Sequence, residues 1–136
     1  MPKAPVFEKK NVLVTGGAGF IGSHLCERLL RDARVICIDS FLTSNERNID
    51  HLLKNPDFEF LRLDINGLNG IEDLPDLARF KIPFQGIQEI YHLAVPNSPK
   101  QFDQYKIETL QTSATGTLNV LELARTYKAK LVFASS

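Results

Sequence analysis

The sequence predicts an α/β fold in which helices cover both faces of a parallel sheet. Short apolar segments of strand length recur along the chain, separated by turn residues or by amphipathic stretches. The expected strands are residues 12–14, 34–38, 58–63, 89–93 and 130–134. Right-handed crossovers between parallel strands then give a doubly wound sheet of about five strands in the order 3-2-1-4-5.

A glycine cluster directly after the first expected strand carries the strongest functional signal. Gly16 lets the chain turn sharply off the strand, where a side chain would clash or a positive φ would be costly. Gly19 lets the backbone approach a pyrophosphate, and Gly22 lets the following helix pack tightly on the strand. The amino end of that helix, near Phe20, offers N–H groups and a partial positive charge to phosphates.

Asp39 ends the second expected strand, 20 residues after Gly19. A glycine cluster alone could form an ordinary turn, but strand, glycine turn, helix, strand and acid in this order form the Rossmann-type dinucleotide-binding fingerprint. The Asp39 carboxylate can accept hydrogen bonds from both hydroxyls of an adenosine ribose, and it would repel a 2′-phosphate. The sequence therefore predicts NAD, rather than NADP, as cofactor.

Residues 15–22 read Thr-Gly-x-x-Gly-x-x-Gly, which resembles the extended short-chain dehydrogenase/reductase family of nucleotide-sugar epimerases, dehydratases and decarboxylases. The resemblance implies an NAD-binding Rossmann domain over residues 11–136, after a disordered lead-in over residues 1–10. Asp64 would lie near the adenine, although an Asp there could instead cap a turn. Beyond the glycines and Asp39, the implied cofactor contacts are Phe20, Ile21, Ser40, Phe41, Thr43, Asp64, Ile65, Leu93, Ala94, Val95 and Thr112.

The fourth expected strand ends in Tyr-His-Leu-Ala-Val, which resembles the family segment whose backbone lines the nicotinamide ribose. His92 could be an acid or base, but a buried core histidine is the favoured interpretation. The following Pro-Asn-Ser-Pro, residues 96–99, resembles the Pro-Ala-Ser-Pro loop of UDP-glucuronate decarboxylases; a rigid proline turn is the alternative. The implied substrate contacts are Pro96, Ser98 and Asn119.

Residues 106–128 have the periodicity of one long helix. Its expected buried stripe is Ile107, Leu110, Ala114, Leu118, Leu121 and Ala124. Gly116 in the middle predicts a close backbone contact, because glycine costs about 1 kcal/mol against alanine there. Ser113 and Gln111 replace an Asn and a Lys of the resembling enzymes, in which this helix contributes to a homodimer interface. A shorter helix is expected over residues 45–54, with Ser44 as its N-cap, and residues 66–86 form a long connection with a helical patch.

Ser136 aligns with the catalytic Ser/Thr of the resembling family. The family's Tyr-x-x-x-Lys pair, whose tyrosinate removes a hydroxyl proton, is missing from these 136 residues. The residues four positions after Tyr91, Tyr105 and Tyr127 are Val95, Thr109 and Leu131. We therefore expect an incomplete enzyme, without its C-terminal substrate domain, that is inactive alone.

The resemblance implies conversion of a UDP-glucuronate-type nucleotide sugar: oxidation at C4, decarboxylation, and re-reduction with NAD retained. A 4-epimerase, a 4,6-dehydratase or a non-catalytic nucleotide-binding module are the alternatives. The 16 basic and 16 acidic residues cancel, which gives no reason to expect nucleic acid or an anionic membrane as partner. Two cysteines in core-like positions favour a reducing, cytoplasmic location, and no metal-ligand spacing is found.

Overall fold

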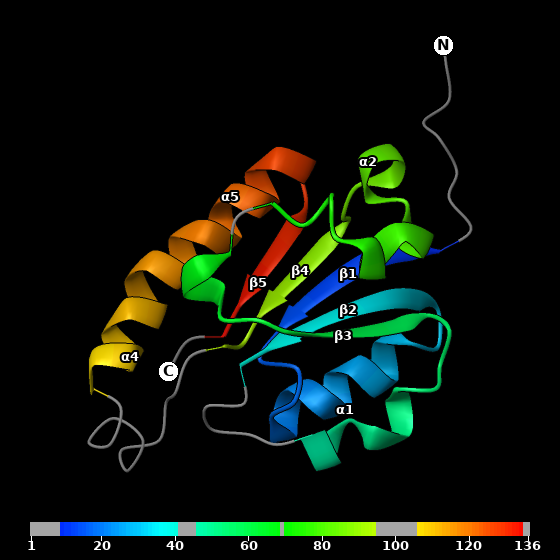
Figure 1. Cartoon of the computed structure of the whole chain (residues 1–136), viewed down its shortest axis with the longest axis horizontal. Helices are drawn as coiled ribbons and strands as arrows, with labels where there is room; N and C mark the ends of the chain where they lie inside the picture. Colours follow the sequence, from blue (N-terminus) through cyan, green and yellow to red (C-terminus); the bar gives the residue numbers. More distant parts are fainter. Residues whose placement is uncertain (1–8, 41–45, 69, 95–105, 135–136) are drawn as a thin grey trace.

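The computed structural model describes residues 9–40, 46–68, 70–94 and 106–134, which form a parallel sheet with helices on both faces (Figure 1). The strand order is β3-β2-β1-β4-β5, and all four pairings are parallel, which confirms the predicted topology. Each strand begins and ends within two residues of its predicted bounds. The strands are β1 (Lys10–Thr15), β2 (Ala33–Asp39), β3 (Phe58–Arg62), β4 (Glu89–His92) and β5 (Lys130–Phe133).

Successive side chains along a strand point to opposite faces of the sheet, and they form two separate cores. Val12 and Val14 of β1 pack with Cys26 of α1 (Phe20–Leu29), whereas Leu13, between them, packs with Val120 of α5 (Thr117–Tyr127). Figure 1 shows α1 and α5 on opposite sides of the sheet. Strand alternation thus produces the double winding, because each face of a strand needs its own helix layer.

The first strand begins slightly before the expected start of the domain. Lys10 belongs to β1, and its Nζ lies 2.9 Å from the Glu89 carboxylate, while Lys9 pairs with Asp57. These two residues are therefore not part of a disordered lead-in, which corrects the expectation from the sequence.

The predicted helix over residues 45–54 is wrong for the residues that the structure describes. They form two short 3₁₀ turns, η1 (Glu46–Asn48) and η2 (Asp50–Leu52), on the α1 side of the sheet. Ile49 and Leu52 are buried against that core, and the Asn48 amide donates to the carbonyl of Ala18 at 2.7 Å. These few residues contact both the core and the glycine turn, which favours tight turns over a continuous helix.

The connection after β3 fills the core on the other face. It forms η3 (Ile65–Gly67), η4 (Pro75–Phe80) and the single-turn α2 (Ile82–Gln85). Its apolar side chains are buried under α5; they are Ile65, Leu68, Ile71, Leu77, Phe80 and Ile82. This segment therefore has a packing role, and the helical patch predicted within it is the 3₁₀ helix η4.

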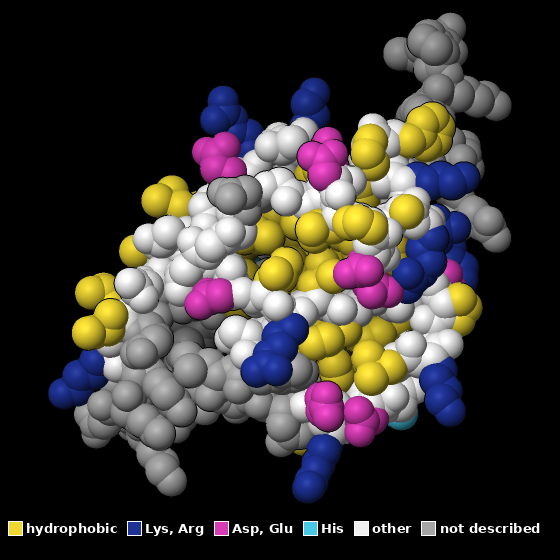
Figure 2. All heavy atoms as spheres, in the orientation of Figure 1, with side chains coloured by type: hydrophobic (Ala, Val, Ile, Leu, Met, Phe, Trp, Pro, Cys, Tyr) yellow, Lys and Arg dark blue, Asp and Glu magenta, His cyan; other side chains and the backbone are white. Residues whose placement is uncertain are grey.

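The long C-terminal helix has nearly the predicted extent but not the predicted buried face. It consists of α4 (Lys106–Gln111), a π-helical segment over Thr112–Gly116, and α5. The buried side chains on it are Val120 and Leu123, next to Gly116. Most of the predicted stripe points outward instead: Ile107, Leu110, Leu118 and Leu121 are 44–71% exposed, and hydrophobic side chains line the outer side of this helix in Figure 2. Of the predicted stripe, Ala124 packs against the core.

The close contact at Gly116 explains this difference. A Cβ on Gly116 would lie 2.6 Å from the Cδ1 atom of Ile65, so the helix approaches the η3 turn through its glycine. The helix carries apolar residues on two faces, and the face with the glycine gives the closer packing. The prediction of a close backbone contact at Gly116 is confirmed. In the part of the chain that the structure describes, no helix has the length and hydrophobicity needed to span a membrane.

Candidate functional site

The carboxyl ends of β1, β2 and β4 meet at the point where the strand order reverses, which is where open α/β sheets bind ligands. The glycine turn lies there. Gly16 has a φ of 74°, and its N–H donates to the carbonyl of Ile38 at 2.7 Å. A Cβ on Gly16 would come within 2.9 Å of the backbone of Leu93 and Ala94. The turn therefore requires glycine both for its backbone angle and for its contact with the end of β4.

The other glycines of the turn differ in what surrounds them. A Cβ on Gly22 would lie 2.3 Å from the Gly16 carbonyl oxygen, and one on Gly17 would lie 2.3 Å from the Cys37 sulfur. Close protein packing thus accounts for both, although the sequence analysis gave Gly17 no role. A Cβ on Gly19 would find only the Gly16 oxygen, at 3.4 Å, among the described atoms. Among the described residues, packing does not account for glycine at 19, and the approach of a ligand to its backbone stays a prediction.

Helix α1 begins at Phe20, immediately after Gly19, so the first N–H groups of the helix lie beside the open space at Gly19. Such a helix end favours phosphate groups. Phe20 and Ile21 are 76% and 71% exposed at this end. Leu25, Leu29 and Leu30 of the same helix are instead partly buried against the core on this face of the sheet.

Asp39 lies at the end of β2 with 9% of its surface exposed. Its Oδ2 atom accepts a hydrogen bond of 3.0 Å from the N–H of Ala18, in the middle of the glycine turn. The carboxylate is thereby fixed in orientation relative to the turn. The Asn48 amide donates to the Ala18 carbonyl, so both backbone polar groups of Ala18 are used. Sequence analysis missed Ala18 and Asn48, because backbone partners leave no signal in residue type.

The structure gives Asp64 and Asn119 contacts within the protein. Asp64 caps η3 by accepting the Asn66 N–H at its Oδ1 atom, 2.9 Å away, which is the alternative considered from the sequence. Ile65 is buried beneath Gly116. The Asn119 amide donates to the carbonyls of Ile65 and Asn66 at 2.7 and 3.2 Å. The adenine contact of Asp64 and Ile65 and the substrate contact of Asn119 remain predictions, and Asn119 would have to use its carbonyl oxygen.

His92 is buried, with 1% of its surface exposed, as predicted for a core histidine. Its ring nitrogens bond the hydroxyls of Thr15 and Thr117. Burial lowers the pKa of His92 to about 4. The ring is therefore neutral near pH 7 and has both nitrogens occupied, which argues against a role as acid or base.

The remaining predicted site residues fall into three groups. Leu93 and Ala94 are half-buried at the end of β4 beside Gly16, and Ser40 is exposed just after Asp39. Thr112 lies in the π-helical segment, but its side chain is outside what the structure describes. Wholly outside the described residues are Phe41, Thr43, Val95, Pro96, Ser98 and Ser136.

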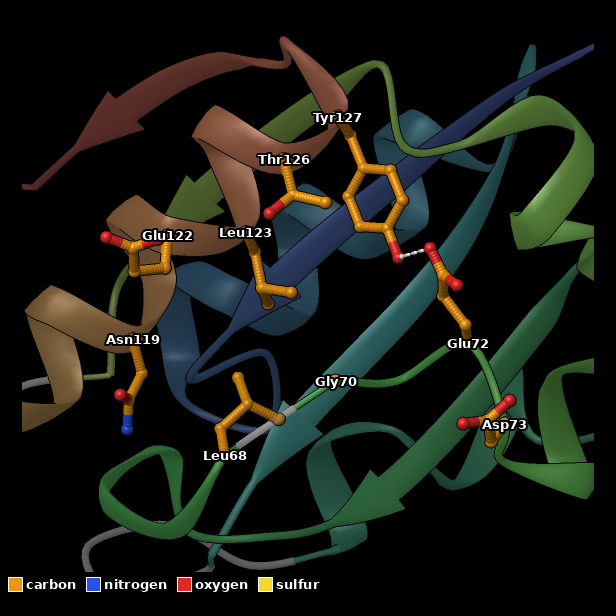
Figure 3. A pocket seen from close by; sticks show the side chains of 9 residues that line it. All are labelled: Leu68, Gly70, Glu72, Asp73, Asn119, Glu122, Leu123, Thr126 and Tyr127. Atoms are coloured by element: carbon orange, nitrogen blue, oxygen red, sulfur yellow. Dashed lines mark hydrogen bonds between the residues drawn. The ribbon is translucent and has the colours of Figure 1, made fainter.

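Two further features lie away from the glycine turn. A cavity of about 480 Å³ lies between α5 and the segment that contributes Leu68, Gly70, Glu72 and Asp73. Figure 3 shows Asn119, Glu122 and Tyr127 on its helix side, with the Tyr127 hydroxyl donating to Glu72 at 2.7 Å. Cys26 and Cys37 are free and buried, and a hydrogen bond with Cys26 together with burial raises the pKa of the Cys37 thiol. Among the described residues, no group of His, Cys, Asp and Glu could hold a metal ion.

Comparison with known proteins agrees with this geometry. The sequence model of the NAD dependent epimerase/dehydratase family matches residues 12–136. The chain belongs to this family. The predicted cofactor, NAD, is thereby confirmed at the level of the family.

The chain is also similar to curated proteins of Danio rerio and Arabidopsis thaliana. The chain is 38% identical to UDP-glucuronic acid decarboxylase 1 of Danio rerio over 130 residues, which are 95% of this chain and 28% of the relative. It is 39% identical to UDP-glucuronic acid decarboxylase 4 of Arabidopsis thaliana over an alignment of 138 positions, which covers 98% of this chain and 28% of the relative. The chain thus spans little more than a quarter of the length of these relatives.

A solved structure supports the fold. The UDP-glucose 4-epimerase of Thermus thermophilus, in complex with NAD, is 34% identical and has a TM-score of 0.68. The match covers 93% of this chain and 37% of the epimerase. The Rossmann-type fold predicted from the glycine spacing is therefore confirmed.

Proposed function

We propose that this chain binds NAD at the glycine turn and is the cofactor-binding part of a nucleotide-sugar-modifying enzyme of the UDP-glucuronate decarboxylase type. The observation that carries the proposal is the Asp39 carboxylate, held beside the glycine turn by the Ala18 N–H at 3.0 Å. A buried acid at this place has a clear ligand, a pair of ribose hydroxyls, and the neighbouring turn leaves the approach to Gly19 open.

Each part of the site would hold one part of the cofactor. The pyrophosphate would lie over Gly19, facing the first N–H groups of α1, where the helix end favours negative charge. Asp39 would accept the hydroxyls of the adenosine ribose, with its carboxyl group oriented by Ala18. The nicotinamide end would extend toward Leu93 and Ala94, whose backbone lies against Gly16. Bound NAD would supply a hydride acceptor for oxidation of a sugar hydroxyl.

A UDP-glucuronate-type substrate is supported by the sequence similarity to one branch of the family. The curated relatives named above are UDP-glucuronic acid decarboxylases, and residues 96–99 resemble the proline loop of that branch. A 4-epimerase is the second candidate, supported by the 34% identity to the Thermus enzyme. The 136 residues contain no Tyr-x-x-x-Lys pair to take up the hydroxyl proton. We therefore propose that this chain alone binds NAD without turning over a sugar substrate.

The outward apolar stripe of α4 and α5 supports a further part of the proposal. Four large apolar side chains on one helix face, Ile107, Leu110, Leu118 and Leu121, are exposed in the single chain. A surface of this kind suits a homodimer contact in the whole enzyme. We also propose a cytoplasmic location, which fits the two free, buried cysteines.

Calorimetric titration of the chain with NAD, with NADP, and then with UDP-glucuronate in the presence of NAD tests the proposal. We expect NAD to bind more tightly than NADP, and no release of CO₂ after UDP-glucuronate is added. Binding of neither dinucleotide by a chain whose circular dichroism is that of a folded α/β protein would overturn the cofactor assignment. Release of CO₂ would show that catalysis does not need the Tyr-x-x-x-Lys pair.

A further inference from the structure

A buried chain of hydrogen bonds joins three elements beneath the candidate site. Thr15 ends β1, His92 ends β4, and Thr117 begins α5. The Thr15 Oγ1 atom lies 2.6 Å from the Nδ1 atom of His92, and the Nε2 atom of the same ring lies 3.1 Å from the Thr117 Oγ1 atom. The ring therefore bridges the first strand and the long helix.

The direction of each hydrogen bond follows from the groups around Thr15. Its Oγ1 atom accepts the N–H groups of Leu93 and Ala94 at 3.1 and 3.3 Å. The hydroxyl's own proton then points to the His92 Nδ1 atom, which must accept it. A neutral ring whose Nδ1 atom accepts carries its proton on Nε2, and that N–H donates to the Thr117 hydroxyl. Burial of the ring disfavours the imidazolium form, in which both nitrogens would donate.

The groups fixed by this chain form one wall of the site. Leu93 also donates its N–H to the backbone oxygen of Thr15 at 3.0 Å, so the peptide after β4 is tied to the end of β1 twice. On the same wall, Gly16 packs so closely against Leu93 and Ala94 that no side chain fits at 16. The ends of β1 and β4 flank the point where the strand order reverses, and a bound dinucleotide would cross between them.

We propose that His92, as the Nε2–H tautomer, is a positioning residue of the NAD site. It orients the Thr15 hydroxyl, which holds the Leu93–Ala94 backbone against the glycine turn. Through Thr117 it also connects this wall to α5. His92 would touch neither cofactor nor substrate. The part of this inference that concerns affinity rests on the proposed NAD binding, whereas the tautomer and the hydrogen-bond chain do not.

The tautomer can be measured on the wild-type chain without any cofactor. A long-range ¹H–¹⁵N spectrum of the ¹⁵N-labelled protein at pH 7 distinguishes protonated from unprotonated ring nitrogens, and a His92→Asn variant identifies the His92 signals among the three histidines. We expect a protonated Nε2 and an unprotonated Nδ1. A protonated Nδ1, in either the other tautomer or the imidazolium, would overturn the inference.

Two variants then separate positioning from simple packing. In His92→Asn the side-chain oxygen can take the place of Nδ1 and accept the Thr15 hydroxyl, whereas His92→Leu fills similar space without an acceptor. We expect His92→Leu to weaken NAD binding about tenfold, which corresponds to ~1.4 kcal/mol, and His92→Asn to recover most of the loss. The matched control is His51→Leu, because His51 is exposed and pairs only loosely with Glu27 at 3.2 Å; we expect no change there.

Titration calorimetry with NAD and a melting curve for each variant provide the result. A folded His92→Leu that binds NAD like the wild type overturns the inference, as does a folded His92→Asn that binds no better than His92→Leu. If His92→Leu does not fold, two results still test the inference: the NAD affinity of His92→Asn, expected to be close to that of the wild type, and the tautomer of His92 in the wild type. A wild-type chain that binds no NAD overturns the proposed function and the role of His92 in it, and the tautomer then decides the hydrogen-bond chain alone.

Discussion

The two faces of the sheet are built in different ways. On the α1 face, most of the site comes from residues close in sequence, namely the glycine turn, the start of α1 and Asp39, and the end of β4 adds one wall. On the α5 face, the packing joins segments far apart, such as Gly116 with Ile65 and Asn119 with the η3 carbonyls. The first face holds Gly19, for which packing among the described residues gives no reason, while the second uses Gly116 for packing.

This contrast separates ligand binding from stability. On the α1 face, a Cβ on Gly19 would meet only the Gly16 oxygen among the described atoms, so a substitution there should cost the fold little. On the α5 face, Gly116 lies in tight contact, so a change there acts on the free energy of unfolding. A substitution at Gly19 should therefore lower the affinity for NAD with little effect on stability. A substitution at Gly116 should lower stability with little effect on the affinity.

The largest effect on binding is expected from Gly19→Val. Gly19 has a φ of −73° and a ψ of 175°, which a valine can adopt, and its surroundings within the described chain are open. We expect an unchanged melting temperature and NAD affinity lowered by about a hundredfold or more, because the side chain would fill the place of the pyrophosphate. Calorimetry and a melting curve test this. If the variant keeps its affinity for NAD, the pyrophosphate does not lie over Gly19.

Asp39→Ala should lower both the affinity for NAD and the stability of the fold. Loss of a charged acceptor for two ribose hydroxyls should weaken NAD binding about 10- to 100-fold. The Ala18 N–H would also lose its acceptor, which costs about 1–3 kcal/mol of stability. Titration with NAD and urea unfolding measure the two effects.

Asp39→Asn is the matched control for this change, because its amide oxygen can still accept the Ala18 N–H. Its stability should be close to that of the wild type, and its preference for NAD over NADP should shrink because the like charge is gone. Addition of a neighbouring Arg should admit NADP better still. Unchanged NAD affinity in Asp39→Ala would contradict the ribose assignment.

The contrast between the faces also explains what could be predicted from the sequence. The strands, their order, the glycine turn and Asp39 follow from local patterns that need no distant partner. The buried side of α5 could not be predicted in this way, because the helix is apolar on two faces. Which face is buried depends on Ile65, about fifty residues earlier. The bridge through His92 was equally invisible, since it needs the ends of β1 and β4 and the start of α5 together.

Gly116→Ala should act in the opposite sense to Gly19→Val. The new Cβ would lie 2.6 Å from the Cδ1 atom of the buried Ile65, so this side chain, the helix or the η3 turn has to shift, at a cost of about 1–3 kcal/mol. We expect urea unfolding at a lower midpoint with only a small change in NAD affinity. Gly67→Ala is the control, because no described atom lies within 4 Å of a Cβ there, and its effect should stay within about 0.5 kcal/mol. Equal effects of the two substitutions would contradict the tight contact.

The smallest effect is expected from Tyr127→Phe on the α5 face, where the hydroxyl donates to Glu72 across the cavity in Figure 3. Burial and Glu72 raise the pKa of Tyr127 well above its usual range. A raised pKa in the folded state means that the stabilisation by the Tyr127 hydroxyl is complete below pH 10 and is lost as pH rises above that value.

Near pH 7 we expect Tyr127→Phe to cost about 0.5–1 kcal/mol, since the hydrogen bond to Glu72 is exposed. Above pH 10 the wild type should lose stability more steeply than Tyr127→Phe, while Tyr91→Phe, whose bond to Glu89 is longer at 3.2 Å, should keep most of the wild-type slope. Equal slopes in all three proteins, measured by urea unfolding across this pH range, would mean that Tyr127 does not contribute to the packing of α5 through its hydroxyl.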